Sequence, residues 1–163
     1  MTEQSFVLKT KSLIDNLKGI CSDYGLGNSG DEFKIITQVF LYKFMNDKFG
    51  YEVKEIDQKL KKAENWEQEI AKYSPTDYEK LLMKMSPDSA KMNREDFLSV
   101  LFTKQDQDNF AKIFDDTLRN ISILNSEIFS VKTGSGAKIQ LFDEISQFIT
   151  DSSQRDSFCK ALV

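Results

Sequence analysis

The chain of 163 residues contains no histidine, the commonest general base and metal ligand among the side chains. Without histidine, neither a Ser–His nor a Cys–His catalytic couple can form. Proline and glycine are also scarce, at two and seven residues. Because few residues break the chain, long helices are favoured over a β-sandwich or a barrel. These absences predict a helical protein without a histidine-based catalytic site.

Cysteine and charge are limited as well. Cys21 and Cys159 lie far apart with no Cys-x-x-Cys pair, so we expect reduced thiols packed as small apolar groups. Residues 1–12 lack the apolar core of a signal peptide, and charges interrupt the longest apolar segment, so we expect a cytoplasmic protein with no membrane partner. The net charge of -4 argues against a dedicated nucleic-acid module, although a local basic patch could still touch DNA.

The most informative segment that is present covers residues 30–50, GDEFKIITQVFLYKFMNDKFG. On a helix, its densest apolar face consists of Phe33, Ile36, Phe40 and Phe44. Further apolar residues cover its flank and back, namely Ile35, Val39, Leu41, Tyr42, Met45 and Phe49. A helix that is apolar on every side is buried. We therefore expect this helix to be the central element of the fold, with Phe40 in the middle of the core.

The other segments also follow helical spacing. Helices are expected over 5–24 and 54–73, after Ser74, after Asn93, after Asp106 or Asp108, and in two segments after residue 142, the last capped by Ser152 or Ser153. Near residues 128–142 apolar residues instead alternate around Gly134-Ser135-Gly136, which predicts a small β-hairpin. The expected fold is all-α: a multi-helix bundle around a buried central helix, in a single domain over residues 1–163.

Short motifs do not indicate a catalytic site. GLGNSG, residues 25–30, spells G-x-G-x-x-G but follows a helical segment instead of a strand, so we interpret it as an interhelical loop with glycines at positive φ. TGSGAK, residues 133–138, lacks the spacing of a phosphate loop. Lys59, Lys61 and Lys62 could face phosphate, but neighbouring glutamates favour a solvated face. We predict no catalytic, cofactor-binding or metal-binding residue.

Two segments resemble the N-terminal helical domain of the methyltransferase (M) subunit of type I restriction–modification systems. LKTKSLIDNLKGI, residues 8–20, is similar to the opening helix of that family, which ends in a Leu-Arg-Gly-like turn, here residues 17–19. VFLYKFMNDKFGYE, residues 39–52, is similar to the family's helix that ends in Lys-x-x-(Ser/Asn)-Asp-x-Phe. The corresponding residues are Lys43, Asn46, Asp47 and Phe49. Residues 54–125 match only in being helical.

The resemblance implies a parent protein that transfers a methyl group from S-adenosylmethionine to the exocyclic amine of adenine in DNA. The implied partners are DNA, a specificity (S) subunit that reads the sequence, a second M subunit and the restriction (R) subunit. In this family the N-terminal domain clamps DNA and assembles subunits, while the catalytic Asn-Pro-Pro-Phe/Tyr motif and the glycine-rich cofactor motif lie downstream. Pro75 and Pro87 are isolated, so no such residue is carried over. We expect a non-catalytic piece of a longer chain, with no cofactor of its own.

The candidates for DNA contact are Lys132 and Lys138, in the expected hairpin. No acidic residue lies between Glu127 and Asp143, which makes this the longest acid-free basic stretch of the chain. A hairpin tip can reach a phosphate backbone, but both lysines could instead solubilise an exposed turn. For the whole chain the alternative is a free-standing helical protein–protein interaction module. The apolar ending, KALV, favours the fragment interpretation.

Overall fold

The computed structural model describes residues 3–126 and 142–163, and the elements assigned within them are all helical. They are α1 (Glu3–Asp23), α2 (Gly30–Ile56), α3 (Gln58–Lys62), α4 (Trp66–Ala71), α5 (Pro75–Met83), the 3-10 turn η1 (Arg94–Asp96), α6 (Leu98–Thr103), α7 (Phe110–Leu124), α9 (Ile145–Phe148) and α10 (Ser152–Leu162). The all-α class is thus confirmed for the described residues. The hairpin expected near residues 128–142 falls on residues 127–141, which lie outside them.

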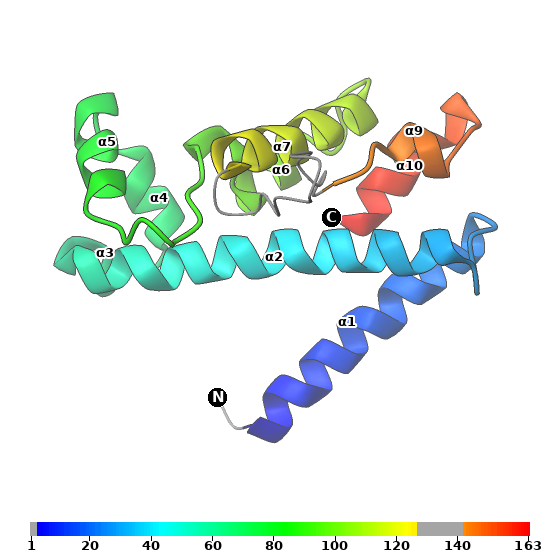
Figure 1. Cartoon of the computed structure of the whole chain (residues 1–163), viewed down its shortest axis with the longest axis horizontal. Coiled ribbons are helices and arrows are strands. Elements are labelled where there is room, and N and C mark those ends of the chain that lie inside the picture. Colours follow the sequence, from blue (N-terminus) through cyan, green and yellow to red (C-terminus); the bar gives the residue numbers. More distant parts are fainter. Residues whose placement is uncertain (1–2, 127–141) are drawn as a thin grey trace, which may run out of the picture.

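The longest helix, α2, runs the length of the molecule (Figure 1). The helices from α3 to α10 lie along one side of it, and α1 leaves its N-terminal end at an angle on the other side. α1 also contacts α10, so helices from opposite ends of the chain meet. α2 therefore has two faces in different surroundings. We call the buried one the inner face; it consists of Ile35, Gln38, Val39, Tyr42, Met45, Asn46, Phe49 and Val53.

The opposite side of α2 carries aromatic side chains that the described residues leave uncovered. Phe33, Phe44 and Tyr51 are 73%, 52% and 67% exposed, and Phe40 is half-buried. We call these four residues the outer stripe. The expectation that the densest phenylalanine face forms the core is therefore wrong. α2 extends beyond residue 50 to Ile56, so the inner face gains Val53 and contacts the core along nearly the whole helix.

The inner face also contains polar side chains, and each of them bonds to the backbone of another segment. Gln38 donates to the carbonyl of Asp143 (3.3 Å) and accepts from its N–H (2.9 Å). The Tyr42 hydroxyl donates to the carbonyl of Asp96 (2.7 Å), and Asn46 accepts from the first N–H of α6 (2.9 Å). Because buried polar groups are tolerated when they are paired, this row at a spacing of four residues fixes α6, η1 and the start of the C-terminal segment against α2.

An aromatic cluster closes the C-terminal half of the inner face. The ring of Phe49 lies 6.0 Å from that of Trp66 and 5.6 Å from that of Phe97, and Trp66 and Phe97 meet edge to face at 5.2 Å. Gly50 lets the indole approach the helix, because a Cβ atom at that position would lie 2.4 Å from Trp66 Cε2. The glycine inside α2 thus serves close packing.

The prediction of a single helix over residues 54–73 is wrong. α2 continues to Ile56, and two polar caps then start separate helices. Asp57 accepts from the N–H of Lys59 (2.9 Å) to cap α3, while Asn65 caps α4 through the first-turn N–H groups. The cap at Ser74 is confirmed, since its hydroxyl accepts from the N–H of Asp77 (3.1 Å). Short polar residues that satisfy first-turn N–H groups divide the segment.

Caps supplied from distant residues were not predicted. α7 follows Asn109, which has φ of 63°, and not Asp106 or Asp108. The carboxylate of Asp156 in α10 accepts from the N–H of Asn109 (3.2 Å) and from that of Ala111 (2.8 Å). α10 itself is capped by Asp151 instead of the expected serines. Local sequence cannot reveal a cap that comes from another helix.

Candidate functional site

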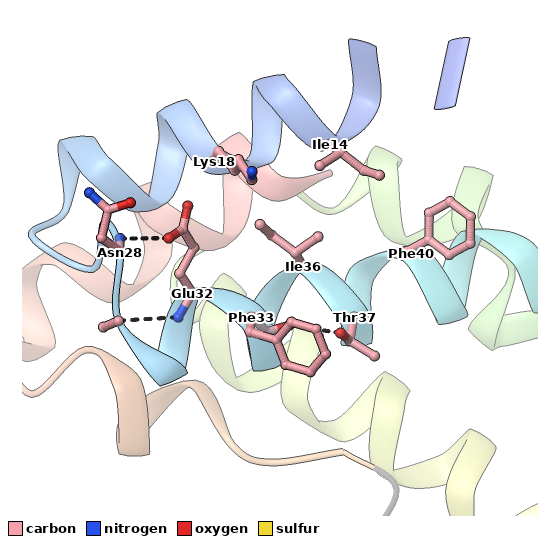
Figure 2. A pocket seen from close by; sticks show the side chains of 9 residues that line it. Ile14, Lys18, Asn28, Glu32, Phe33, Ile36, Thr37 and Phe40 are labelled. Atoms are coloured by element: carbon pink, nitrogen blue, oxygen red, sulfur yellow. Dashed lines mark hydrogen bonds between the residues drawn. The ribbon is translucent and has the colours of Figure 1, made fainter. Parts of the chain in front are cut away.

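A groove of about 480 Å³ lies between α1 and the N-terminal half of α2. It is lined by Ile14 and Lys18 of α1, by Asn28 and Ser29 of the connecting loop, and by Glu32, Phe33, Ile36, Thr37 and Phe40 of α2. Figure 2 shows Ile36 on the α2 wall, facing Ile14 and Lys18 on α1. The floor of the groove is apolar; Asn28, Ser29 and Glu32 lie at its loop end, and Lys18 and Thr37 lie along the helices.

The loop between α1 and α2 fixes the angle at which the groove opens. Gly25 and Asn28 adopt φ of 78° and 58°, so the interpretation of this loop is confirmed at Gly25, although an asparagine takes the second left-handed position. Ser29 accepts from the N–H of Glu32 (3.3 Å), and the Glu32 carboxylate accepts from the N–H of Asn28 (2.6 Å; Figure 2). This reciprocal capping engages the one acidic side chain of the groove.

Two exposed lysines lie near the groove. Lys18 lies on the α1 wall, and Lys34 follows Phe33 on α2. Both lysines are exposed, and neither forms an ion pair with any residue in 3–126 or 142–163. The groove therefore has an apolar floor and charges of both signs near its edges, since the exposed Asp15 lies three residues before Lys18 on α1.

The outer stripe continues the apolar surface beyond the groove. Phe33, Thr37, Phe40, Phe44, Asp47 and Tyr51 fall at spacings of four, three, four, three and four residues, so the stripe also includes a threonine and an exposed aspartate. These are the a and d positions of a heptad, the seam along which one helix packs against another. α1 lines the groove beside Phe33 and Phe40 but diverges from the rest of α2 (Figure 1), which leaves Phe44 and Tyr51 uncovered.

A second hollow, at the N-terminal ends of α7 and α10, is structural. Arg119 pairs with Glu144 (2.5 Å) and with Asp116 (3.1 Å). Asp115 accepts from the N–H of Ile145 (3.0 Å), and burial raises the pKa of Asp115 to about 6. Because each of these charges has a partner that holds α9 in place, the hollow needs no ligand to explain it.

A third hollow has a basic edge formed by Lys59, Lys80 and Lys84, from α3, α5 and the residue after α5. In its centre the Tyr73 hydroxyl donates to the Asp57 carboxylate. That hydrogen bond, followed by the backbone bond and nearby lysines, holds the pKa of Asp57 below its usual range. The three lysines form no ion pair with the acids that the structure describes. Asp57, Glu69 and Asp77 line the same hollow.

The site residues predicted from sequence are only partly located. Lys132 and Lys138 lie outside the described residues, as does TGSGAK. Lys61 pairs with Glu55 (3.8 Å), as the solvated-face interpretation predicts. Within the described ranges no cluster of three Cys, Asp or Glu side chains could hold a metal ion. In the same ranges no helix has the length and apolarity needed to cross a membrane.

The cysteines are free and buried in the described structure, as expected. Burial raises the pKa of Cys21 to about 11 and raises that of Cys159 further. A thiol that stays protonated is a poor nucleophile, so both act as core residues. The site that the sequence did not reveal is the groove, because Phe33 and Phe40 were assigned to the core. The available signal was the a/d spacing that runs from Phe33 to Tyr51.

The residues that carry the family resemblance are divided between core and surface: Leu17, Asn46 and Phe49 are buried, whereas Lys18, Gly19 and Asp47 are exposed. Asn46 and Phe49 are on the inner face, where they hold α6 and the aromatic cluster. Lys43 is half-buried, and burial lowers its pKa. Comparisons with models of protein families, with curated proteins and with solved structures found no match to this chain.

Proposed function

We propose that the chain is the N-terminal assembly and DNA-clamping domain of an adenine-specific DNA methyltransferase subunit of a type I restriction–modification system. The observation that carries the assembly role is the outer stripe together with the groove. Large exposed apolar surfaces on a folded domain mark interaction sites. The resemblance supplies the link to the methyltransferase subunit, and its two segments form most of α1 and the middle of α2.

In this proposal the chain is a helical bundle around α2 with a hairpin near residues 128–142. Lys132 and Lys138 contact the phosphate backbone, and the edge formed by Lys59, Lys80 and Lys84 adds a second basic surface. Phosphate contacts of this kind position a protein on DNA without reading its sequence. Sequence reading then belongs to the specificity subunit, while the second M subunit and the restriction subunit complete the assembly.

Methyl transfer belongs to a downstream domain that would bind S-adenosylmethionine. The residues described here do not fit that cofactor. The most glycine-rich loop among them joins two helices, and its Asn28 N–H is already bound to the Glu32 carboxylate. We therefore assign no step of the reaction to this chain.

The reading frame downstream of Val163 tests the proposal directly. We expect it to encode a glycine-rich cofactor motif and then Asn-Pro-Pro-Phe/Tyr. A stop codon immediately after Val163 would overturn the methyltransferase assignment. A second test is calorimetric titration of the isolated chain with S-adenosylmethionine, which should show no binding. A dissociation constant tighter than about 100 μM, near -5.5 kcal/mol, would contradict the proposal that a downstream domain binds the cofactor.

The second candidate is a free-standing helical protein–protein interaction module. The apolar floor of the groove favours it, because that surface suits a protein partner and would serve equally well without DNA. The net charge of -4 points the same way. The two candidates share the groove and differ in the downstream reading frame.

A further inference from the structure

We propose that Asn28, in the loop between α1 and α2, is a site of spontaneous deamidation through a cyclic imide formed with the backbone nitrogen of Ser29. In this reaction the nitrogen attacks the side-chain carbonyl carbon of Asn28, a succinimide ring closes, and ammonia leaves. Water then opens the ring at either carbonyl and gives aspartate or isoaspartate. The net change consumes water and releases ammonia, so it needs no oxidant, cofactor or enzyme. It is also independent of the proposed function.

The residues around Asn28 allow the ring to close. The next residue is a serine, whose small side chain leaves its backbone nitrogen accessible. Gly27 and Gly30 flank the pair, and glycine permits the backbone rotation that brings this nitrogen toward the asparagine side chain. Asn125 is the other asparagine that precedes a serine, while the remaining six precede larger residues. The chain thus contains the same dipeptide in two settings.

The reacting groups of Asn28 are exposed and unpaired. Asn28 lies outside the helices, with φ of 58°. Within residues 3–126 and 142–163, neither its side-chain amide nor the N–H of Ser29 forms a hydrogen bond. The backbone N–H of Asn28 is bonded to the Glu32 carboxylate (2.6 Å; Figure 2), but that nitrogen takes no part in ring closure. No hydrogen bond of the attacking nitrogen or of the amide has to break first.

Asn125 has the opposite surroundings. The residue is 2% exposed. Its amide oxygen accepts from the N–H of Lys91 (2.7 Å), and its amide nitrogen donates to the carbonyls of Lys91 (2.8 Å) and Ile121 (2.9 Å). Ring closure there requires a local opening of the fold, and each 1.4 kcal/mol of opening free energy slows the reaction about tenfold. In the folded chain we therefore expect Asn28 to react at least about tenfold faster than Asn125.

The products would disturb the capping of α2. Aspartate and isoaspartate both place a new carboxylate near that of Glu32, and like charges repel. Isoaspartate also adds a methylene to the main chain just before Ser29. The Ser29 hydroxyl donates to the carbonyl of Leu26 (2.7 Å) and accepts from the N–H of Glu32 (3.3 Å), so its position matters for the cap. Loss of these bonds should lower the thermal midpoint.

Ageing of the 163-residue chain at mildly alkaline pH tests the inference. Peptide mapping by mass spectrometry follows the conversion of each asparagine amide to a carboxyl group, and chromatography against synthetic standards separates aspartate from isoaspartate. In the folded chain, conversion should be at least about tenfold faster at Asn28 than at Asn125. In the chain unfolded by guanidinium chloride the two asparagines should react at similar rates, because each precedes a serine.

Three variants separate ring closure from capping. Ser29→Thr keeps the capping hydroxyl, but its β-branched side chain crowds the backbone nitrogen. Conversion at Asn28 should therefore slow while the thermal midpoint stays near that of the wild type. The matched control, Ser126→Thr, should leave the rate at Asn28 unchanged. Asn28→Asp carries the new charge without the extra methylene, so the purified isoaspartate species should unfold at a lower temperature than this variant.

Two results would overturn the site itself. One is an equal rate at Asn28 and Asn125 in the folded chain. The other is a rate at Asn28 that rises at least about tenfold on unfolding, because the folded loop would then hold the reacting groups apart. An unchanged rate in Ser29→Thr would exclude the Ser29 nitrogen as the attacking group. An isoaspartate species as stable as the wild type would contradict the effect on the cap.

Discussion

The two faces of α2 are both rich in large apolar side chains, yet only one of them is buried. The inner face contains Tyr42 and Phe49, each 1% exposed, alongside the buried polar residues Gln38 and Asn46. The outer stripe is more uniformly aromatic and largely exposed. The buried face is therefore the one that includes amide side chains, and the exposed face is the one whose sequence is typical of a hydrophobic core.

The difference shows that pairing of polar groups, more than apolar density, determines which face is inside. Gln38 and Asn46 are buried because each meets backbone groups of another segment at hydrogen-bond distance. A buried amide without such partners would cost about 1–3 kcal/mol. The outer stripe contains no such row of buried, paired polar groups, and no helix among the described residues covers its second half. The face of α2 that lacks such polar anchors is the one left exposed.

The largest expected contrast comes from the same truncation on the two faces. Phe49→Ala should cost about 3–5 kcal/mol, because the ring is buried against Trp66 and Phe97 and its loss leaves a cavity. Phe44→Ala, on the outer stripe, should cost less than about 1 kcal/mol. Urea unfolding of both variants measures the difference. Equal losses would show that the two faces have been assigned to the wrong sides.

Removing a polar anchor should have the next largest effect. Asn46→Ala leaves the first N–H of α6 without its acceptor and should cost about 1–3 kcal/mol. The matched control is Thr37→Ala, since the Thr37 hydroxyl is exposed and bonds only to the carbonyl of Phe33 in its own helix. The control should change the free energy of unfolding by less than about 0.5 kcal/mol. If Asn46→Ala is as mild as the control, the polar row does not hold α6.

A glycine pair separates close packing from helix propensity. Gly50→Ala should destabilise by about 1–3 kcal/mol, because the new methyl group would overlap the Trp66 indole. Gly19 lies inside α1 with nothing within 4 Å of an added Cβ atom. Gly19→Ala should therefore stabilise by about 0.5–1 kcal/mol through helix propensity alone. Thermal unfolding of both variants should shift in opposite directions, and a shift in the same direction would contradict the contact with Trp66.

How much of this could be predicted depends on whether the signal is local. α1, the loop after it and the cap at Ser74 follow from spacing, glycine and a short polar residue within a few positions. The helix breaks at Asp57 and Asn65 also have a local cause, because each side chain caps the helix that follows it. The Lys and Glu residues around them continue the helical spacing, so the sequence alone predicts one unbroken helix there. The all-α class followed from the scarcity of proline and glycine.

The remaining features depend on residues far apart in the sequence. Asp156 caps α7 from another helix, and Gln38 bonds to Asp143, 105 residues away. The choice between the two faces of α2 depends on those same distant partners. A single sequence therefore indicated that α2 is central but not which side faces inward, and the groove went unrecognised for that reason. Lys132 and Lys138 remain a prediction, because they lie outside the described residues.

A buried carboxyl beneath the inner face gives a pH dependence. Burial raises the pKa of Asp96 to about 6, from an ordinary value of 3.8. Between these values the folded chain holds a proton that the unfolded chain releases, so this group's contribution to stability falls as pH rises from about 4 to about 6. Asp96→Asn should flatten that part of the stability profile by on the order of 1 kcal/mol. Asp115→Asn, at a second carboxyl with a pKa of about 6, should flatten it further in the double variant. A wild-type profile that rises over this range would contradict the assignment.

The smallest expected effect is on the outer stripe itself, where the contrast with the inner face is sharpest. Phe33→Gln and Tyr51→Gln replace side chains that are 73% and 67% exposed, so almost no apolar contact is lost. Glutamine also has a slightly better helix propensity than either aromatic residue. The free energy of unfolding of the double variant should stay within about 0.5 kcal/mol of wild type, and its urea dependence should be unchanged. A loss above about 1 kcal/mol would show that the isolated chain already covers this surface. The outer stripe would then belong to the core of the fold, and its aromatic side chains would not mark an interaction surface.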